Sequence, residues 1–261
     1  MRSHSYLVSR VSSILLVALA LLISAQPALA EPTFDETFEQ SYPLAAGGTF
    51  TLANVNGSVQ VDGWEKDVVQ VRALKTARSN EKDLARVQIV VVAEAGQVAV
   101  RTVYPQDQGV EVAVEYRIRV PHRVFLGRVE TVNGTVKVRS VEGAGDLRTV
   151  NGNVELLDGA GRFSARTTNG NVRMELRLLP AGSPMRLQTV NGAIELSLTA
   201  DAEADLEVDT LNGEFLSDLP VTVRGSIGPR AFRGRLGGGG STIRISAVNG
   251  TVRIATARPS V

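Results

Sequence analysis

A repeated Asn-Gly pair is the feature that most constrains how this chain can fold. The pair occurs seven times, and Val or Leu precedes six of the copies. The copies are Asn56-Gly57, Asn133-Gly134, Asn151-Gly152, Asn169-Gly170, Asn191-Gly192, Asn212-Gly213 and Asn249-Gly250. A recurring unit of this kind is typical of a stacked architecture in which each copy adds one layer. We therefore predict that the seven pairs are structural turns.

The residues on both sides of each pair alternate between apolar and polar. Counting from the Asn, positions −6 and −4 are apolar in most copies, and so are positions +3 and +5. In the copy at Asn191, for example, Leu187 stands at −4 and Ile194 at +3. Position −2 is Thr in five copies. This alternation, rich in β-branched residues, predicts a strand on each side of the turn.

Two turn geometries fit an Asn-Gly pair, because both residues tolerate positive φ. One is the tight turn of a β-hairpin. The other is a corner in a β-solenoid, where the preceding Val can point inward. Successive Asn residues from 133 to 212 are 18, 18, 22 and 21 apart, and further turn signals lie at 142–145, 158–161 and 180–182. One coil of two short strands and two turns fits this length, so we favour the corner.

Position +4 carries charges of alternating sign. The residues are Lys137, Glu155, Arg173 and Glu195. If the coils stack in register, these side chains become neighbours, and each opposite-charge pair contributes about 0.2–1 kcal/mol. The predicted fold is therefore all-β, a stacked β-solenoid or β-roll of Asn-Gly repeats over residues 129–261.

The segment 31–128 is predicted to be a less regular N-terminal β portion of the same domain. It has strand-like runs at 68–73, 87–93, 98–104 and 110–120. Ser79-Asn80-Glu81 is a capping sequence for one short helix that ends near Arg86. The alternative is a separate N-terminal subdomain.

The first 30 residues have the pattern of a secretory signal peptide. Arg2 and Arg10 supply positive charge, an apolar run covers 11–23, and Ala28 and Ala30 form a small-x-small cleavage site. The run is shorter than the ~20 apolar residues that span a bilayer, so we favour cleavage after Ala30 over an uncleaved anchor. We then expect an exported chain that is periplasmic, at the cell surface or secreted, with no transmembrane segment after cleavage.

Composition limits the partners of the exported chain. It has no Cys, so a hydrophobic core rather than disulfides has to stabilise it. Without Arg2 and Arg10 the 28 basic residues become 26, against 27 acidic ones. A chain so close to neutrality argues against a nucleic-acid partner, which favours a basic surface.

No catalytic, cofactor-binding or metal-binding residues are predicted. His122 is the one His after the signal peptide, and no Gly-x-Ser-x-Gly motif is present. Five acidic residues alternate along one strand, namely Asp201, Glu203, Asp205, Glu207 and Asp209. Alternation places them on one face. We favour a solvated outer face, because a calcium site needs converging oxygens rather than a row.

Trp64 follows the first repeat. One interpretation is a platform for a ligand. We favour a cap over the open end of the stack, because the end coils of a repeat protein have to be covered.

Several segments resemble the bacterial putative-adhesin family, an exported β-strand-repeat domain of unknown function. They are Gly57-Ser58-Val59-Gln60-Val61 with Gly63-Trp64, then Tyr116 to Pro121, then Gly237 to Gly240 followed by Val248-Asn249-Gly250. The resemblance implies a stacked β protein of the cell envelope, in some relatives alongside envelope-stress signalling. It implies no catalytic residues.

The function expected from these features is a non-enzymatic, adhesin-like structural or interaction module of the bacterial cell envelope. Its partner would be an envelope polymer or protein. One alternative is an envelope-stress sensor. Another is a calcium-assisted enzyme acting on polysaccharides, built on the acidic row.

Overall fold

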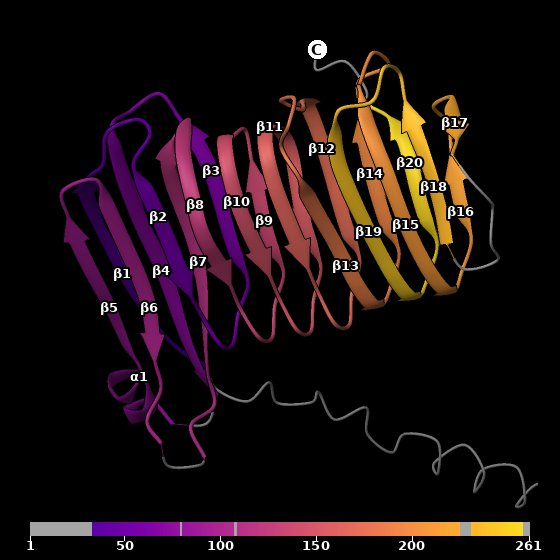
Figure 1. Ribbon diagram of the computed structural model, residues 1–261. Coiled ribbons are helices and arrows are strands. Elements are labelled where there is room, and N and C mark those ends of the chain that lie inside the picture. The colour runs from indigo at the N-terminus through magenta and orange to yellow at the C-terminus, as the bar shows by residue number, and fades with distance from the viewer. Residues whose placement is uncertain (1–32, 79, 107–108, 225–230, 258–261) are drawn as a thin grey trace, which may run out of the picture. The chain divides into compact units, whose positions relative to one another are not determined.

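The structure, a computed structural model, describes residues 33–78, 80–106, 109–224 and 231–257. The predicted signal peptide, with Ala28 and Ala30, lies outside these residues. The described part contains twenty strands in one sheet, one short helix α1 (Lys82–Arg86), and one hydrophobic core (Figure 1). The predicted all-β class with one short helix is therefore confirmed.

Two ladders of parallel strands form the body of the structure. The first ladder contains the strands that precede the Asn-Gly pairs, extended by β6. In spatial order they are β6 (Gln97–Val103), β2 (Thr49–Ala53), β8 (Arg123–Glu130), β10 (Glu142–Arg148), β11 (Val154–Arg166), β13 (Met185–Asn191), β19 (Ser241–Asn249) and β15 (Ala204–Asn212).

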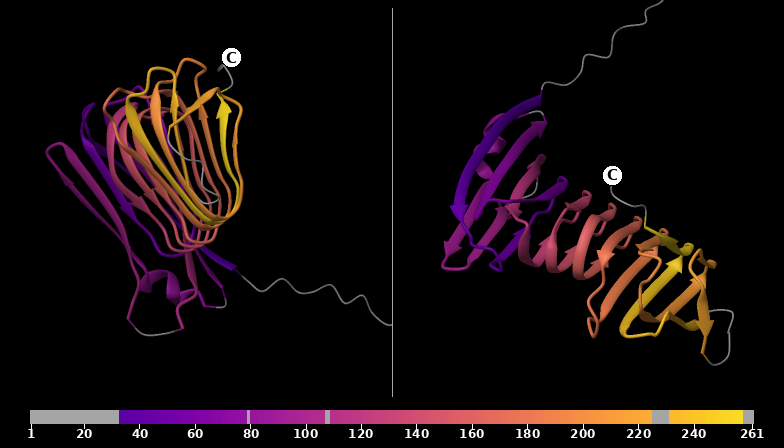
Figure 2. Two further views of the ribbon diagram at one scale, coloured as in Figure 1. Left: turned by 45° about the vertical axis from the view of Figure 1, so that its right-hand side comes forward. Right: turned by 90° about the horizontal axis from the view of Figure 1, so that it is seen from above.

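The second ladder contains the strands that follow the Asn-Gly pairs, extended by β7. In spatial order they are β7 (Val112–Pro121), β3 (Val59–Trp64), β9 (Val136–Arg139), β11, β12 (Val172–Leu178), β14 (Ile194–Leu198), β20 (Val252–Thr256) and β16 (Phe215–Ser217). The early half of β11 belongs to this ladder and its later half to the first. The chain thus passes from one ladder to the other and back (Figure 2).

The hairpin interpretation of the Asn-Gly pairs is wrong. The strands on either side of a pair do not bond to each other across the turn. Around Asn133, β8 pairs with β2 and β10, whereas β9 pairs with β3 and β11. Each pair is therefore a corner between two strands whose partners come from other repeats.

Antiparallel strands close both ends of the parallel ladders. At the N-terminal end, β4 (Val68–Arg78) pairs with β7 and β1 (Thr33–Pro43), and β5 (Gln88–Glu94) pairs with β6. These strands confirm the four strand-like runs predicted between residues 68 and 120. At the other end, β18 (Ala231–Leu236) pairs with β15 and β17 (Val221–Val223).

The order of the coils in space differs from their order along the chain. The coil β2–β3, first in sequence, lies between β6–β7 and β8–β9. The coil β19–β20, last in sequence, lies between β13–β14 and β15–β16. Coils from both ends of the described chain are therefore enclosed by neighbours on both sides.

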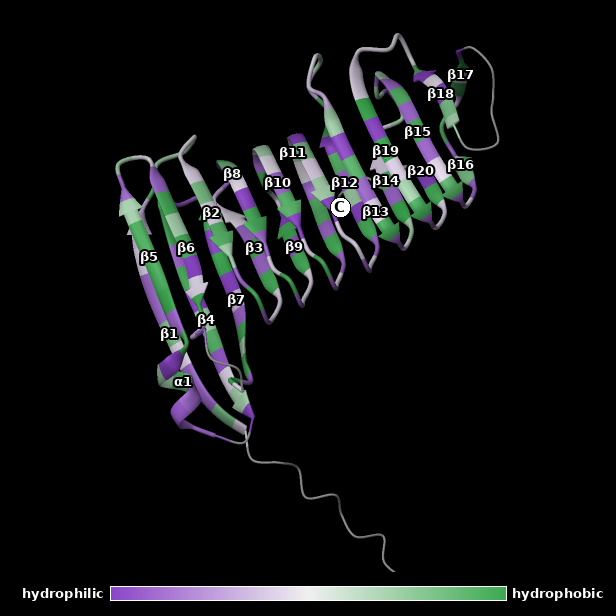
Figure 3. Cartoon of the chain, turned by 60° about the horizontal axis from the view of Figure 1, so that its bottom comes forward, coloured by the Kyte–Doolittle hydropathy of each residue, from purple (hydrophilic) through white to green (hydrophobic). Residues whose placement is uncertain are grey.

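The core lies between the two ladders and is filled by the predicted alternating positions (Figure 3). Val154, Val172 and Ile194 at +3 are at most 1% exposed. The copy at Asn151 has Gly145 at −6 where other copies have a larger side chain. A Cβ there would stand 2.8 Å from the ring of Phe163, so the Phe of the next coil fills this space.

One of the three further turn signals is wrong. Residues 142–145 lie in β10, and the bend before this strand is at Ser140, with φ of 51°. At 158–161 the chain stays in β11 but bends at Asp158, with φ of 54°, and residues 181 and 182 form a turn. Apart from Ser140 and Asp158, no non-glycine residue of the described chain has positive φ. A left-handed backbone at these two sites turns the chain from one ladder into the other.

Candidate functional site

The Asn side chains of the seven corners form one continuous hydrogen-bonded ladder. The spatial order is Asn56, Asn133, Asn151, Asn169, Asn191, Asn249 and Asn212. In this order, each Asn after Asn56 donates from its Nδ2 to the Oδ1 of the preceding Asn, at 2.8–2.9 Å. Side-chain amides stacked in this way hold the corners in register, which is a structural role.

The Gly of each pair allows one coil to lie directly on the next. A Cβ on Gly152 would stand 2.1 Å from the carbonyl oxygen of Gly134, and a Cβ on Gly170 would stand 1.9 Å from that of Gly152. These distances are far below van der Waals contact, so any larger residue would separate the coils. The Thr at −2 uses the same carbonyl: Thr149 Oγ1 donates to the Gly134 oxygen at 2.8 Å.

Two expectations about the corners are wrong. The Asn residues do not have positive φ, so Asn is required for its side-chain amide rather than for backbone freedom. The Val or Leu at −1 does not point inward. Those before Asn56, Asn133, Asn151, Asn191 and Asn212 are 37–47% exposed. The inward position near the corner is −2, where five copies have a buried Thr. The hydroxyl groups of Thr131, Thr149, Thr167 and Thr189 donate to a Gly carbonyl of the neighbouring coil.

His122 lies in a charged cluster at the opposite corner of the coils. Its Nε2 is 3.3 Å from Arg177 Nη2 and 4.0 Å from Glu142 Oε2. Arg177 also pairs with Asp158 at 3.2 Å. The Ser140 hydroxyl donates to Asp158 at 2.9 Å and not to His122. Because Arg177 of β12 contacts Glu142 of β10 and Asp158 of β11, these ion pairs join neighbouring coils.

Asp205, Glu207 and Asp209 lie on the outer face of β15, as we favoured. Asp201 and Glu203 precede this strand, so the prediction of one strand with all five acidic residues is wrong. Leu206 and Val208, which alternate with the three acidic residues of β15, are buried. Asp205 pairs with Arg235 at 2.8 Å and Glu207 with Arg244 at 2.6 Å. The hydrogen bond from Arg235 lowers the pKa of Asp205. No group of three or more acidic or His side chains is placed to hold a metal ion within the described ranges.

The prediction that Trp64 caps the stack is wrong. Trp64 is the last residue of β3, which has β7 on one side and β9 on the other, so it does not belong to an end coil. Its indole N–H donates to the Val68 carbonyl at 2.8 Å. Lys66 and Arg119 lie 5.1 and 5.6 Å from the ring centroid. A half-exposed ring with two cations is a surface cation–π contact.

A hollow on the outer face of the first ladder has the character of a binding site. It spans β8, β10, β11 and β13, and its volume is about 500 Å³. Its lining includes four arginines, Arg148, Arg162, Arg166 and Arg186, and we call it the arginine groove. This volume lies in the range of sites that bind small molecules.

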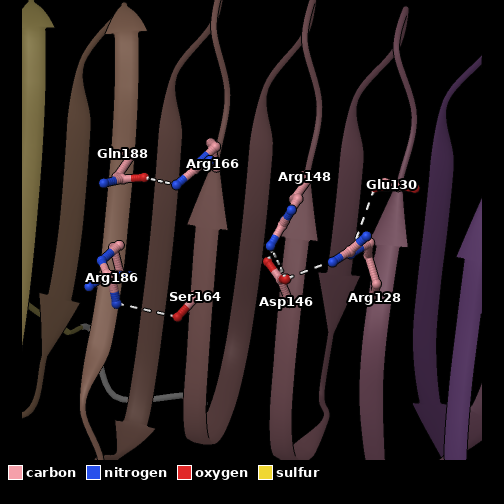
Figure 4. A network of polar contacts seen from close by, with 8 residues as sticks. All are labelled: Arg128, Glu130, Asp146, Arg148, Ser164, Arg166, Arg186 and Gln188. Atoms are coloured by element: carbon pink, nitrogen blue, oxygen red, sulfur yellow. Dashed lines mark hydrogen bonds and ion pairs between the residues drawn. The ribbon is translucent and has the colours of Figure 1, made fainter.

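Polar side chains in and beside the groove form a network between adjacent strands (Figure 4). Arg148 Nε donates to Asp146 Oδ1 at 2.9 Å, and this hydrogen bond raises the pKa of Arg148. Arg128 lies 3.9 Å from the same carboxylate. Arg166 donates to the Gln188 side chain. Asp146 therefore neutralises part of the charge at the β8–β10 end.

The remaining groove arginines have no carboxylate partner. Within the described part of the chain, no Asp or Glu forms an ion pair with Arg162, Arg166 or Arg186, all three of which are exposed. Ser164 Oγ accepts only the backbone N–H of Arg186, at 3.3 Å. These guanidinium groups are available to an anion from outside the molecule.

The two ladders differ in their outward charges. On the second ladder, Glu155 lies in register with Lys137 and Arg173, and Lys137 Nζ is 2.9 Å from Glu155. Glu195 continues the alternation beside Arg173, as the sequence predicted. The first ladder has two opposite-charge neighbours, Glu130 with Arg148 and Glu207 with Arg244. It also places two like pairs side by side in the register, Arg148 with Arg166 and Arg186 with Arg244. Like charges directly opposite each other destabilise a sheet.

The signal for this site is present in the sequence, although no single copy shows it. Positions −3 and −5 point outward, and they hold Arg148 and Arg166 at −3 and Arg128, Arg186 and Arg244 at −5. The Arg residues of different copies become one patch only when the coils are in register.

The likeness of this chain to known proteins is distant. No protein-family model and no curated protein matches it. Within the described residues no helix is long and apolar enough to span a bilayer. The chain is similar to a solved structure described as a putative cell adhesion protein from Clostridium sporogenes, with 12% identity, TM-score 0.49, and coverage of 85% of this chain and 100% of that one.

Two further solved structures are similar. One is described as a putative adhesin from Bacteroides fragilis, with 11% identity, TM-score 0.36, and coverage of 84% and 97%. The other is described as a putative lipid binding protein from Parabacteroides distasonis, with 10% identity, TM-score 0.23, and coverage of 84% and 96%. The adhesin descriptions agree with the family that the sequence resembles. At these TM-scores no function transfers, so function has to be argued from the chain's own residues.

Proposed function

We propose that this chain is an exported, non-enzymatic, adhesin-like interaction module of the bacterial cell envelope, which binds its partner through the arginine groove. The expected partner is an envelope polymer or an envelope protein. No nucleic acid is expected, because basic and acidic residues are nearly balanced. We also propose cleavage after Ala30, and a periplasmic or cell-surface location for the product.

The scaffold of the module is, in this proposal, a β-solenoid or β-roll in which the Asn-Gly copies are corners. The parallel register from coil to coil supports this class, as does the Asn ladder along the corners. Residues 129–261 would be the repeat portion and 31–128 the less regular portion. A stack of this kind presents a long, rigid outer face, which suits recognition of extended partners.

The observation that carries the proposal is the juxtaposition of Arg148 with Arg166 on neighbouring strands. The other ladder places opposite charges at equivalent positions, which stabilises the stack. Neighbouring arginines in a groove lower the stability of the fold. Residues that lower stability in this way are typical of a binding surface rather than of a surface with a structural role.

A non-enzymatic role is supported by the side chains around His122. Among the described residues the nearby hydroxyl of Ser140 is bonded to Asp158. His122 contacts Arg177, a cation, and a cation is not a group that activates His as a general base. The groove itself contains arginines, one carboxylate and neutral groups, a set suited to binding anions.

The proposal is tested by co-sedimentation of the protein with isolated cell wall, with outer membrane and with anionic liposomes, each at low and high salt. Binding to cell wall or outer membrane at low salt that weakens at high salt, as expected for exposed arginines, supports the module and identifies its ligand class. If the folded protein stays in the supernatant with every fraction, it does not bind the envelope, and the proposal is rejected.

A further inference from the structure

We infer that the ligand of the arginine groove is a linear anionic polysaccharide, one that carries carboxylate or phosphate groups along its length. This inference rests on the proposed function, because it takes the groove as the binding face of the module. It adds the chemical class of the ligand and the residues that recognise it.

The charge of the ligand follows from the unpaired guanidinium groups. Arg162, Arg166 and Arg186 are exposed and have no carboxylate partner among the described residues. A guanidinium binds carboxylate or phosphate oxygens through two parallel hydrogen bonds, a geometry that Lys cannot provide.

The spacing of the arginines favours a polymer. Arg148 and Arg166 occupy equivalent positions on adjacent strands, which are about 4.8 Å apart. Arg162 and Arg166 are four residues apart on β11, a distance of roughly 13 Å along a strand. A chain with charges at intervals would meet these guanidinium groups one after another.

The uncharged lining favours a sugar chain. Phe125 is 50% exposed at the β8 end of the groove, and its ring offers an apolar face to the C–H groups of a sugar. Gln188, Ser164 and Asp146 supply hydroxyl-binding groups among the arginines. A ligand that presents hydroxyl groups, C–H faces and anions together would use all of these residues.

The shape of the groove argues against a membrane and against an acidic peptide. Its floor carries small residues, Gly127, Ala144 and Ser164, so the arginines surround a hollow rather than a protruding patch. A planar bilayer would touch the rim alone. The strands below the groove are paired on both sides, so no free edge is present to accept an extended peptide as a further strand.

The test compares three probes by calorimetry or by a pull-down with immobilised polymer. They are polygalacturonate, poly-L-glutamate of matched charge and length, and neutral dextran. We expect the protein to bind polygalacturonate, to bind poly-L-glutamate roughly tenfold more weakly, and not to bind dextran. Anionic vesicles are a fourth arm.

Two variants locate the site. Changing Arg162, Arg166 and Arg186 together to Gln is expected to weaken polygalacturonate binding about tenfold or more, because charge-assisted bonds are lost. The control variant changes Arg117, Arg139 and Arg173, which are exposed on the second ladder, together to Gln. This variant is expected to change the affinity for polygalacturonate by less than about twofold. Unaltered thermal unfolding shows that each variant is folded.

A further variant separates sugar recognition from charge recognition. Phe125→Ala should weaken binding of polygalacturonate and leave the weak binding of poly-L-glutamate unchanged. The inference is overturned if the folded groove variant binds polygalacturonate like the unmodified protein. It is also overturned if poly-L-glutamate or anionic vesicles bind as tightly as polygalacturonate.

The failure of the inference and that of the proposed function are distinguishable in the envelope assay. If the groove variant co-sediments with the cell envelope as the unmodified protein does, the module stands and the groove is not its site. If polygalacturonate binding depends on the groove arginines but no envelope fraction is bound, the polysaccharide site stands and the envelope function is rejected.

Discussion

At the scale of the residue, the corners depend on groups with separate tasks. The Asn amide bonds to the Asn of the neighbouring coils, and the Gly lets two backbones approach. At four corners the Thr hydroxyl at −2 also donates to a Gly carbonyl of the neighbouring coil. In the first copy Asn54 stands at −2, where five copies have Thr and the copy at Asn249 has Ala247. The Asn54 Nδ2 donates to the Gly57 carbonyl at 3.1 Å and the Val114 carbonyl at 2.9 Å.

Asn151→Ala is expected to lower the free energy of unfolding by about 1–2 kcal/mol, because two ladder hydrogen bonds are lost. They are the bonds to Asn133 at 2.9 Å and from Asn169 at 2.8 Å. Asn212→Ala is the matched control. Asn212 ends the ladder and makes one such bond, so we expect about half the loss. Equal losses in urea denaturation would show that the ladder does not set the stability.

At the scale of the element, a buried polar network joins strands from different parts of the chain. Thr102 Oγ1 on β6 donates to Asn54 Oδ1 at 2.8 Å, next to β2, and lies 2.7 Å from the Tyr116 hydroxyl on β7. Tyr116 is 1% exposed, and burial raises its pKa to about 12. The network connects the two ladders across the core at their N-terminal end.

This network predicts a loss of stability at alkaline pH. The folded pKa of Tyr116 lies above its usual value of 10.0, so its contribution is complete below pH 10 and is lost as the pH rises toward 12. A shift of this size corresponds to roughly 2–3 kcal/mol. Between pH 10 and pH 12 the free energy of unfolding should fall in both proteins. We expect the fall in Tyr116→Phe to be smaller than in the unmodified protein by about this amount. Parallel curves for the two proteins would refute the assignment.

At the scale of the whole molecule, the last coil in sequence completes the interior of the stack. β19 separates β13 from β15, and β20 separates β14 from β16. Until the chain is finished, β15 and β16 have no parallel partners on that side. Their incorporation therefore depends on residues made after them.

Removal of residues 238–261 is expected to release the strands that this coil holds. Amide protons of β15 and β18 should exchange with solvent far faster than in the intact protein, because local opening exposes them. Amides of β9 and β10 lie several coils away and are the internal control. Hydrogen exchange followed by mass spectrometry measures both. Protection of β15 that survives the deletion would contradict the role of β19.

The sequence by itself determined the features that repeat locally. The alternation at −4, +3 and +5 determined the strands and their inward faces, since a strand with one buried face requires period two. It also placed the turns at Asn-Gly, although the reason proved to be the Asn amide and the close approach at Gly152 rather than positive φ at Asn151. Local patterns of this kind are readable because neighbours in sequence decide them.

The tertiary structure alone decided which strands are partners. Any order of coils satisfies the same alternating pattern. The pattern therefore does not predict that Asn56 lies beside Asn133, or that Asn249 lies beside Asn191. The exposure of Val150 and the meeting of Arg148 with Arg166 are consequences of that register. A parallel strand can take its partner from anywhere along the chain, and only the packed core selects one arrangement.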